Sequence, residues 1–313
     1  FLAAWVPAAV AVAFAMAAPH EWFDSLFGPA VGVYVGGLKL RVTQAAIILA
    51  GGLVVHILGL IDDVRPLGAI VKLVVLGAVG AAVAWLADVR IGTMWGAGFS
   101  IAITTLWFLV ILNAFNFLDN MDGLSAGVAW ICLAFVAVCG LTGDHVQVLV
   151  PALACVFLGA IGGFWAFNFP PAKIFMGDAG SLLVGYMLAV TSVLTTYYRS
   201  GGETPPYALA MPLVILAVPL YDFLSVIMIR ILEGRNPLKG DQRHFSHRLV
   251  DRGLDRRLAV MTIYLATATT GLTATLLPGA DLTRTLTVAI IVVMILSIVA
   301  ILESPLRRDT DNE

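Results

Sequence analysis

The sequence predicts an all-α, polytopic integral membrane protein. Of its 313 residues, 60% are hydrophobic and only 12% are charged, whereas roughly 25% of the residues in an ordinary soluble domain are charged. The apolar residues fall into runs of about 20, the length that a helix needs to cross a bilayer. The charged residues collect in short segments between these runs, a pattern that makes nucleic acid an unexpected partner.

Ten apolar runs qualify as membrane-spanning helices, and together they form one expected domain over residues 1–313. They are residues 1–18, 43–61, 67–87, 100–117, 124–142, 148–168, 180–198, 208–231, 257–277 and 285–303. The fourth run is the weakest, because Asn113 and Asn116 make its end polar and an unsatisfied polar group in hydrocarbon is costly. The chain begins with Phe1 inside an apolar run rather than with Met, so we expect a further helix upstream.

The distribution of Lys and Arg predicts the orientation in the membrane. With ten spans, the loops near 62–66, 118–123, 169–179 and 232–256 lie on the same side as the tail after residue 303. That side carries Arg65, Lys173, Arg235, Lys239, Arg243, Arg248, Arg252, Arg256, Arg307 and Arg308, and the opposite loops carry Lys39, Arg41, Arg90, Arg199 and Arg284. Since basic residues favour the cytoplasmic side, we expect a multi-pass protein of the plasma (inner) membrane whose richer face is cytoplasmic.

The acidic residues collect on that same face. Asp62 and Asp63 end the second span, where lipid gives way to water. Two like charges this close raise the pKa of one group unless a cation neutralises them, and a helix C-terminus disfavours acids. A divalent cation, or a proton to be abstracted, would favour the pair; two solvated acids at a helix end are the alternative.

A second polar segment ends the fourth span. Asn113, Asn116, Asp119 and Asp122 recur at every third position, so a helical continuation would place them on one stripe. Such a stripe in an apolar segment fits the recognition of a polar ligand or a metal. A helix end capped by Asn and Asp is the alternative.

A third segment, residues 175–181, places Asp178 between glycines at the start of the seventh span. Backbone N–H groups at a helix start favour anions, and the glycines allow close approach to a diphosphate. Asp178 is an oxygen ligand of the kind that holds Mg²⁺ together with substrate phosphates. A plain helix cap is the alternative.

The only long polar stretch, residues 230–257, contains Arg243 and Arg248 around His244 and His247. Guanidinium groups and imidazoles together suit a ligand that carries phosphate. An anchor for anionic lipid headgroups would explain the arginines but not the histidines. A transition-metal site on the His-x-x-His pair is disfavoured, because the pair supplies only two ligands and no Cys lies nearby.

Lys72 and Asp222 are charged residues well inside spans, where such residues are functional candidates. Lys72, one turn into the third span, could reach a phosphate or the acids at 62 and 63, with snorkelling to the interface as the alternative. Asp222, deep in the eighth span, could act directly or orient a neighbour.

Together these segments resemble the polyprenyl-phosphate N-acetylhexosamine-1-phosphate transferase superfamily. The matching stretches, in the family's order, are 59–63, 113–124, 168–181, 219–222 and 241–248. The third and fifth are more similar to the bacterial UDP-GlcNAc:undecaprenyl-phosphate GlcNAc-1-phosphate transferases than to the enzyme that acts on UDP-MurNAc-pentapeptide. Two positions depart from the pattern: Asn120 stands where glycine is usual, and Ser246 where a middle histidine is common.

The resemblance implies Mg²⁺-dependent transfer of GlcNAc-1-phosphate from UDP-GlcNAc to polyprenyl (undecaprenyl) phosphate, with release of UMP, at the start of cell-envelope glycan synthesis. Mn²⁺ is the expected substitute metal, and a homodimer is compatible with the family. The implied catalytic residues are Asp62, Asp63, Asp178, His244 and His247. The implied metal ligands are Asp178 and Asp122. The implied substrate-binding residues are Lys72, Asn113, Asn116, Asp119, Asp122, Asn168, Arg243 and Arg248.

Two alternatives stay open. One is the UDP-MurNAc-pentapeptide phosphotransferase of peptidoglycan synthesis. The other is an ion-coupled secondary transporter, because intramembrane acids and Lys also mark ion pathways. Transporter sites lie near the bilayer midplane at a repeat interface, whereas here the acids lie at helix ends and no repeat is apparent.

Overall fold

The computed structural model describes residues 29–142, 149–195, 206–236 and 244–303. Within these ranges the chain forms eleven α-helices and one 3-10 helix. They are α3 (Pro29–Val64), α4 (Ala69–Leu86), η1 (Thr93–Trp95), α5 (Ala97–Leu118), α6 (Leu124–Thr142), α7 (Leu149–Asn168), α8 (Gly177–Leu194), α9 (Pro206–Ile215), α10 (Ala217–Leu232), α11 (Phe245–Asp251), α12 (Arg256–Ala274) and α13 (Leu282–Glu303). The expected all-α architecture is confirmed, and the expected first span, 1–18, lies outside the described residues.

Seven of these helices are long and apolar enough to cross a membrane, and the number rises to eight if the bent pair α9 and α10 counts as one span. The chain is therefore a multi-pass membrane protein, but the described residues do not confirm ten spans. The expected span 257–277 forms α12, which is not among the seven. Its five threonines and two arginines, at positions 256 and 257, make it less apolar than the other long helices.

The expected continuous span 208–231 is wrong in detail, because the helix breaks at Leu216 and the two halves meet at a bend of 75°. Pro219 explains the break. Proline lacks an N–H group, and its ring clashes with the carbonyl group four residues earlier, which belongs to Ile215, the last residue of α9. The bend divides the segment into α9 and α10, and α10 carries Asp222.

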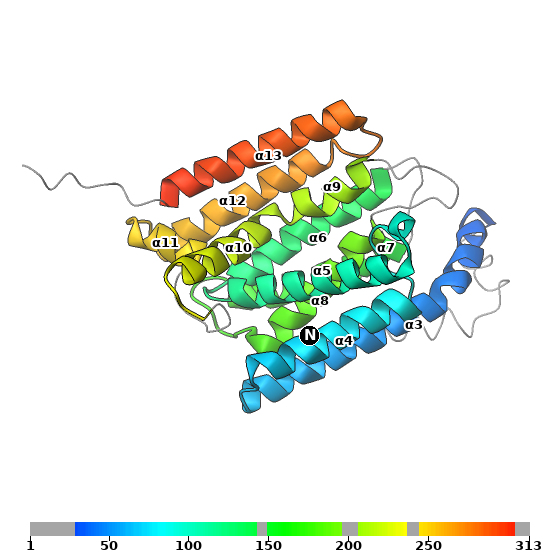
Figure 1. Cartoon of the computed structure of the whole chain (residues 1–313), viewed down its shortest axis with the longest axis horizontal. Helices are drawn as coiled ribbons and strands as arrows, with labels where there is room; N and C mark the ends of the chain where they lie inside the picture. The colour runs from blue at the N-terminus through cyan, green and yellow to red at the C-terminus, as the bar shows by residue number, and fades with distance from the viewer. Residues whose placement is uncertain (1–28, 143–148, 196–205, 237–243, 304–313) are drawn as a thin grey trace, which may run out of the picture.

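Helix α8 is the centre of the bundle. Its residues 179–193 are all buried, and it packs mainly against α3 and α5. In Figure 1, α3 and α4 lie along one edge of the molecule and α12 and α13 along the opposite edge. Gly59 of α3 allows the closest approach, because a Cβ atom there would lie 2.4 Å from the Cα atom of Ala179. The end of α3 and the start of α8 are therefore held together.

Two predicted loops differ from the structure. The loop at 232–256 contains a short helix, α11, whose formation gives the residues after His244 fixed directions. The seventh span begins at Gly177 rather than at residue 180, so Asp178 lies in the first turn of α8 instead of before it. Both differences bear on the site.

Candidate active site

Asp63 joins the end of α3 to the start of α8. Its carboxylate accepts hydrogen bonds from the backbone amides of Asp178, at 2.8 Å, and Ala179, at 3.1 Å. A carboxylate is favourable at a helix N-terminus, which explains how this acid is tolerated at the end of its own helix. Gly177 is required beside it, because it has a φ of +64° and a Cβ atom there would lie 2.7 Å from the carboxylate.

Lys72 bridges two further acids. Its ammonium group lies 2.9 Å from a carboxylate oxygen of Asp62 and 2.9 Å from one of Asp178. The Leu67 amide also donates to Asp62, at 2.6 Å, and Asn116 donates to Asp178, at 2.9 Å. Lys72 therefore binds acids from two helices that are far apart in sequence, rather than only reaching toward the interface.

Asp119 completes this group of acids from the loop after α5. Burial and the nearby charges of Asp178 and Asp63 raise its pKa to about 7, and a hydrogen bond from the Gly177 amide opposes the shift. We call Asp62, Asp63, Asp119 and Asp178 the acid cluster. Four carboxyl groups with one bridging ammonium leave an excess of negative charge.

The acid cluster fits a hard divalent cation by its charge and its oxygen donors. Mg²⁺ typically takes one or two carboxylates and completes its coordination with waters and substrate phosphates. Among the described residues, no three His, Cys, Asp or Glu side chains are arranged to enclose a metal. The arrangement thus suits a metal held jointly by protein and ligand rather than by a closed protein cage.

Asn168 and Asp122 hold neighbouring loops together. Asn168 is 3% exposed, accepts from the Gly123 amide at 3.0 Å and donates to the Ile174 carbonyl at 2.8 Å. Asp122 accepts from the Ala172 amide at 3.0 Å. These contacts give Asn168 a loop-organising position, although the sequence suggested a binding role.

Asn113 and Asn116, expected on one ligand-facing stripe, have different partners. Asn113 donates to the Leu109 carbonyl of its own helix, at 2.7 Å. Asn116 donates to Asp178 and also to Ser181, at 3.1 Å. Of the two amides, only Asn116 has a hydrogen bond to the acid cluster.

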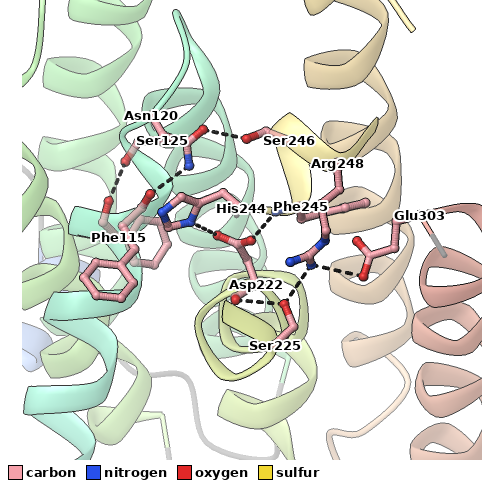
Figure 2. Close-up of polar contacts among 11 residues, drawn as sticks. Phe115, Asn120, Ser125, Asp222, Ser225, His244, Phe245, Ser246, Arg248 and Glu303 are labelled. Atoms are coloured by element: carbon pink, nitrogen blue, oxygen red, sulfur yellow. Dashed lines mark hydrogen bonds and ion pairs between the residues drawn. The ribbon is translucent and has the colours of Figure 1, made fainter. Parts of the chain in front are cut away.

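Asp222 orients His244, as Figure 2 shows. The Asp222 carboxylate, 1% exposed, lies 3.0 Å from Nδ1 of His244 and accepts from the Phe245 amide at 2.6 Å. Because a carboxylate only accepts hydrogen bonds, Nδ1 of His244 carries the hydrogen of this contact. The ring of His244 also meets Phe117 edge to face, with ring centroids 5.7 Å apart.

A cavity of about 440 Å³ lies beside these loops. It is lined by Asn120, Met121, Asp122, Pro170, His247, Arg256 and Val260. Burial and the neighbouring His244 lower the pKa of His247, so its ring is mainly neutral at neutral pH. Arg256 is a lining residue that the sequence motifs did not predict. Its place at the end of the basic stretch, eight residues beyond the last matched motif, was the available signal.

Arg248 points away from the cavity. It donates to Ser225 at 2.8 Å and forms an ion pair with Glu303 of α13 at 3.0 Å. In Figure 2, both contacts lie on one side of Asp222 and Asn120 lies on the other. The structure therefore gives Arg248 a contact between helices where the sequence predicted substrate binding. Arg243 lies outside the described residues.

Comparison with known proteins identifies relatives of this chain. Residues 45–196 match the family model described as glycosyl transferase family 4. The "Probable undecaprenyl-phosphate N-acetylglucosaminyl 1-phosphate transferase" of Bacillus subtilis is 33% identical over 285 residues, which cover 87% of this chain and 76% of that protein. A decaprenyl-phosphate N-acetylglucosaminephosphotransferase of Mycolicibacterium smegmatis is 37% identical, over 73% of this chain and 62% of that protein. The undecaprenyl-phosphate alpha-N-acetylglucosaminyl 1-phosphate transferase of Escherichia coli K12 is 26% identical, over 80% of this chain and 71% of that protein.

Proposed function

Since the chain belongs to glycosyl transferase family 4, we propose that this membrane enzyme transfers GlcNAc-1-phosphate from UDP-GlcNAc to a polyprenyl phosphate and releases UMP. The observation that carries the proposal is the acid cluster bridged by Lys72, in which side chains from α3, α4, α5 and α8 meet. The names of the relatives support the sugar phosphate and the lipid acceptor.

In the proposed reaction, a phosphate oxygen of the lipid attacks the β-phosphorus of UDP-GlcNAc. The bond from the β-phosphorus to the oxygen that bridges it to the α-phosphorus breaks, and that oxygen leaves with UMP. Asp63 is exposed, whereas Asp62 is bound to Lys72. Asp63 is therefore the better candidate to accept a proton from the lipid phosphate or to orient it.

Phosphoryl transfer depends on positioning and on neutralising charge. Asp178, fixed by Lys72 and Asn116, is the favoured protein ligand for Mg²⁺ or Mn²⁺, with Asp122 as a second candidate. When bound, the metal would neutralise the negative charge of the diphosphate. Lys72 would add positive charge beside the same phosphates.

The cavity that contains His247 and Arg256 is the proposed donor site. Its lining offers a carboxylate, an imidazole and a guanidinium group, which suit a polar nucleotide sugar. The excess of Lys and Arg on this face favours a cytoplasmic site at the plasma membrane, where a soluble donor can meet a lipid acceptor.

The test is UMP release by the purified protein with undecaprenyl phosphate and Mg²⁺, using UDP-GlcNAc and UDP-MurNAc-pentapeptide side by side. We expect release with UDP-GlcNAc only, and its loss when Mg²⁺ is chelated. Release only with the pentapeptide donor would favour the peptidoglycan enzyme. Ion-coupled flux into proteoliposomes without UMP release would favour the transporter and reject the proposal.

A further inference from the structure

Asn120 and Ser246 form a hydrogen bond that joins two segments far apart in sequence. The Ser246 hydroxyl donates to Oδ1 of Asn120 at 2.5 Å, and Ser246 is 1% exposed (Figure 2). The orientation of the amide is fixed, because its Nδ2 group donates to the Phe117 carbonyl at 2.8 Å, leaving Oδ1 as the acceptor. These are the two positions that depart from the family motifs, and in the structure they contact each other.

The contact acts on α11, which has only seven residues. A helix this short is not stable alone, so its tertiary contacts decide where it lies. Asp222 holds its start through the Phe245 amide, and Glu303 holds Arg248 on the side away from the cavity. Ser246 supplies the hydrogen bond on the side toward the 119–123 loop.

The same contact borders the cavity. Asn120 lines the cavity, and so does His247, the residue next to Ser246 in the chain. The loop after α5 forms one wall of the cavity, α11 and α12 form another, and Pro170 after α7 completes the lining. The Asn120–Ser246 hydrogen bond connects the first two walls. Without it, α11 would keep its anchors at Asp222 and Glu303 but lose its hydrogen bond to the loop that carries Asn120.

We propose that the Asn120–Ser246 hydrogen bond positions His247 at the donor cavity and thereby sets the affinity for the nucleotide sugar. Asn120 and Ser246 are positioning residues, which act through His247. The donor part of this inference rests on the proposed function, whereas the contact itself can be tested without it.

The contact is tested by amide hydrogen exchange over residues 245–251 in the detergent-solubilised full chain. A neutral hydrogen bond contributes an amount that corresponds to a roughly two- to tenfold change in an equilibrium, so Ser246→Ala should speed exchange there by about that factor. Ser246→Thr, which keeps the hydroxyl, should restore slow exchange. The matched control is Ser125→Ala, which removes an equally buried hydroxyl that donates to the Phe115 carbonyl. Equal exchange in Ser246→Ala and the unchanged protein would overturn the contact.

The donor part is tested by steady-state UMP release. Ser246→Ala and Asn120→Gly should each raise KM for UDP-GlcNAc roughly two- to tenfold, while kcat and KM for undecaprenyl phosphate stay within about twofold. The double variant should be no worse than the single variants, because both remove the same interaction. Additive effects, an unchanged donor KM or an equal rise in both KM values would reject the positioning role. If the unchanged protein releases no UMP, the proposed function fails, and hydrogen exchange still decides whether the contact holds α11.

Discussion

Asp63 and Asp178 are joined directly: the carboxylate of Asp63, at the end of α3, accepts the backbone N–H of Asp178 at 2.8 Å. The side chain of Asp178 is held separately by Lys72 and Asn116. Two acids 115 positions apart in sequence thus have a fixed relative position. This relationship makes the acid cluster one site and allows the role of each member to be tested.

Asp63→Asn should separate the chemical role of this residue from its structural one. The amide oxygen can still accept one of the two α8 amides, so we expect the free energy of unfolding to fall by only about 1 kcal/mol. Turnover should fall by about a hundredfold or more, because an amide cannot accept a proton from the lipid phosphate. Thermal unfolding and UMP release measure the two effects. A folded variant with nearly unchanged kcat would remove Asp63 from the reaction.

Lys72→Met should leave Asp62 and Asp178 without their shared ammonium group. Repulsion between the carboxylates should then displace them. We expect kcat/KM to fall by roughly tenfold or more, because this is the effect of losing a hydrogen bond to a charged group. Lys72→Arg, which keeps the charge but changes the geometry, should retain more activity than Lys72→Met. Equal activities of the Met variant and the unchanged protein would show that the bridge is not needed.

Asp178→Asn should weaken the response to Mg²⁺. We expect the Mg²⁺ concentration for half-maximal UMP release to rise by about tenfold or more. The matched control is Asp281→Asn, at the N-terminus of α13, where Asp281 accepts from the Arg284 amide and asparagine caps equally well. An unchanged Mg²⁺ response in Asp178→Asn would reject this residue as the principal metal ligand.

Asp222→Asn tests the orientation of His244. An amide can donate as well as accept, so it no longer requires the hydrogen on Nδ1. We expect kcat to fall by about tenfold or more, with a smaller change in the donor KM, since the imidazole tautomer would no longer be fixed. Steady-state kinetics at several pH values check this, and an unchanged pH profile and kcat would contradict an orienting role.

Variants of Arg248 and Glu303 test whether Arg248 joins two helices or binds the substrate. The two side chains are 14% and 10% exposed, so each single change to Gln should lower the free energy of unfolding by about 2 kcal/mol. The double change should lower the free energy of unfolding by less than the sum of the two single changes. Any rise in the donor KM should be the same in Arg248→Gln and in Glu303→Gln. A large rise in donor KM in Arg248→Gln, without the same rise in Glu303→Gln, would restore the binding role that the sequence suggested.

The sequence predicted the helical architecture and the meeting of the acids because both follow from simple rules. Long apolar runs must become helices in lipid, and runs that alternate in direction bring Asp62, Asp119 and Asp178 to the same face. Side-chain direction in the connecting segments was not predictable. Arg248 turned toward α13 because α11 forms within the expected loop, and Asn168 became buried because the 169–176 loop folds back over it. The break at Pro219 was visible as a residue, but its 75° bend depends on packing.

The most direct test of the central claim uses UDP-GlcNAc radiolabelled at the β-phosphorus. Attack on that phosphorus carries the label into the lipid together with the sugar, whereas transfer of the sugar alone would leave the label in water-soluble UDP. We predict labelled polyprenyl-diphospho-GlcNAc in the organic extract, in amounts equal to the UMP released and formed about a hundredfold more slowly by Asp63→Asn. Label that stays in the aqueous phase while GlcNAc reaches the lipid would contradict the account.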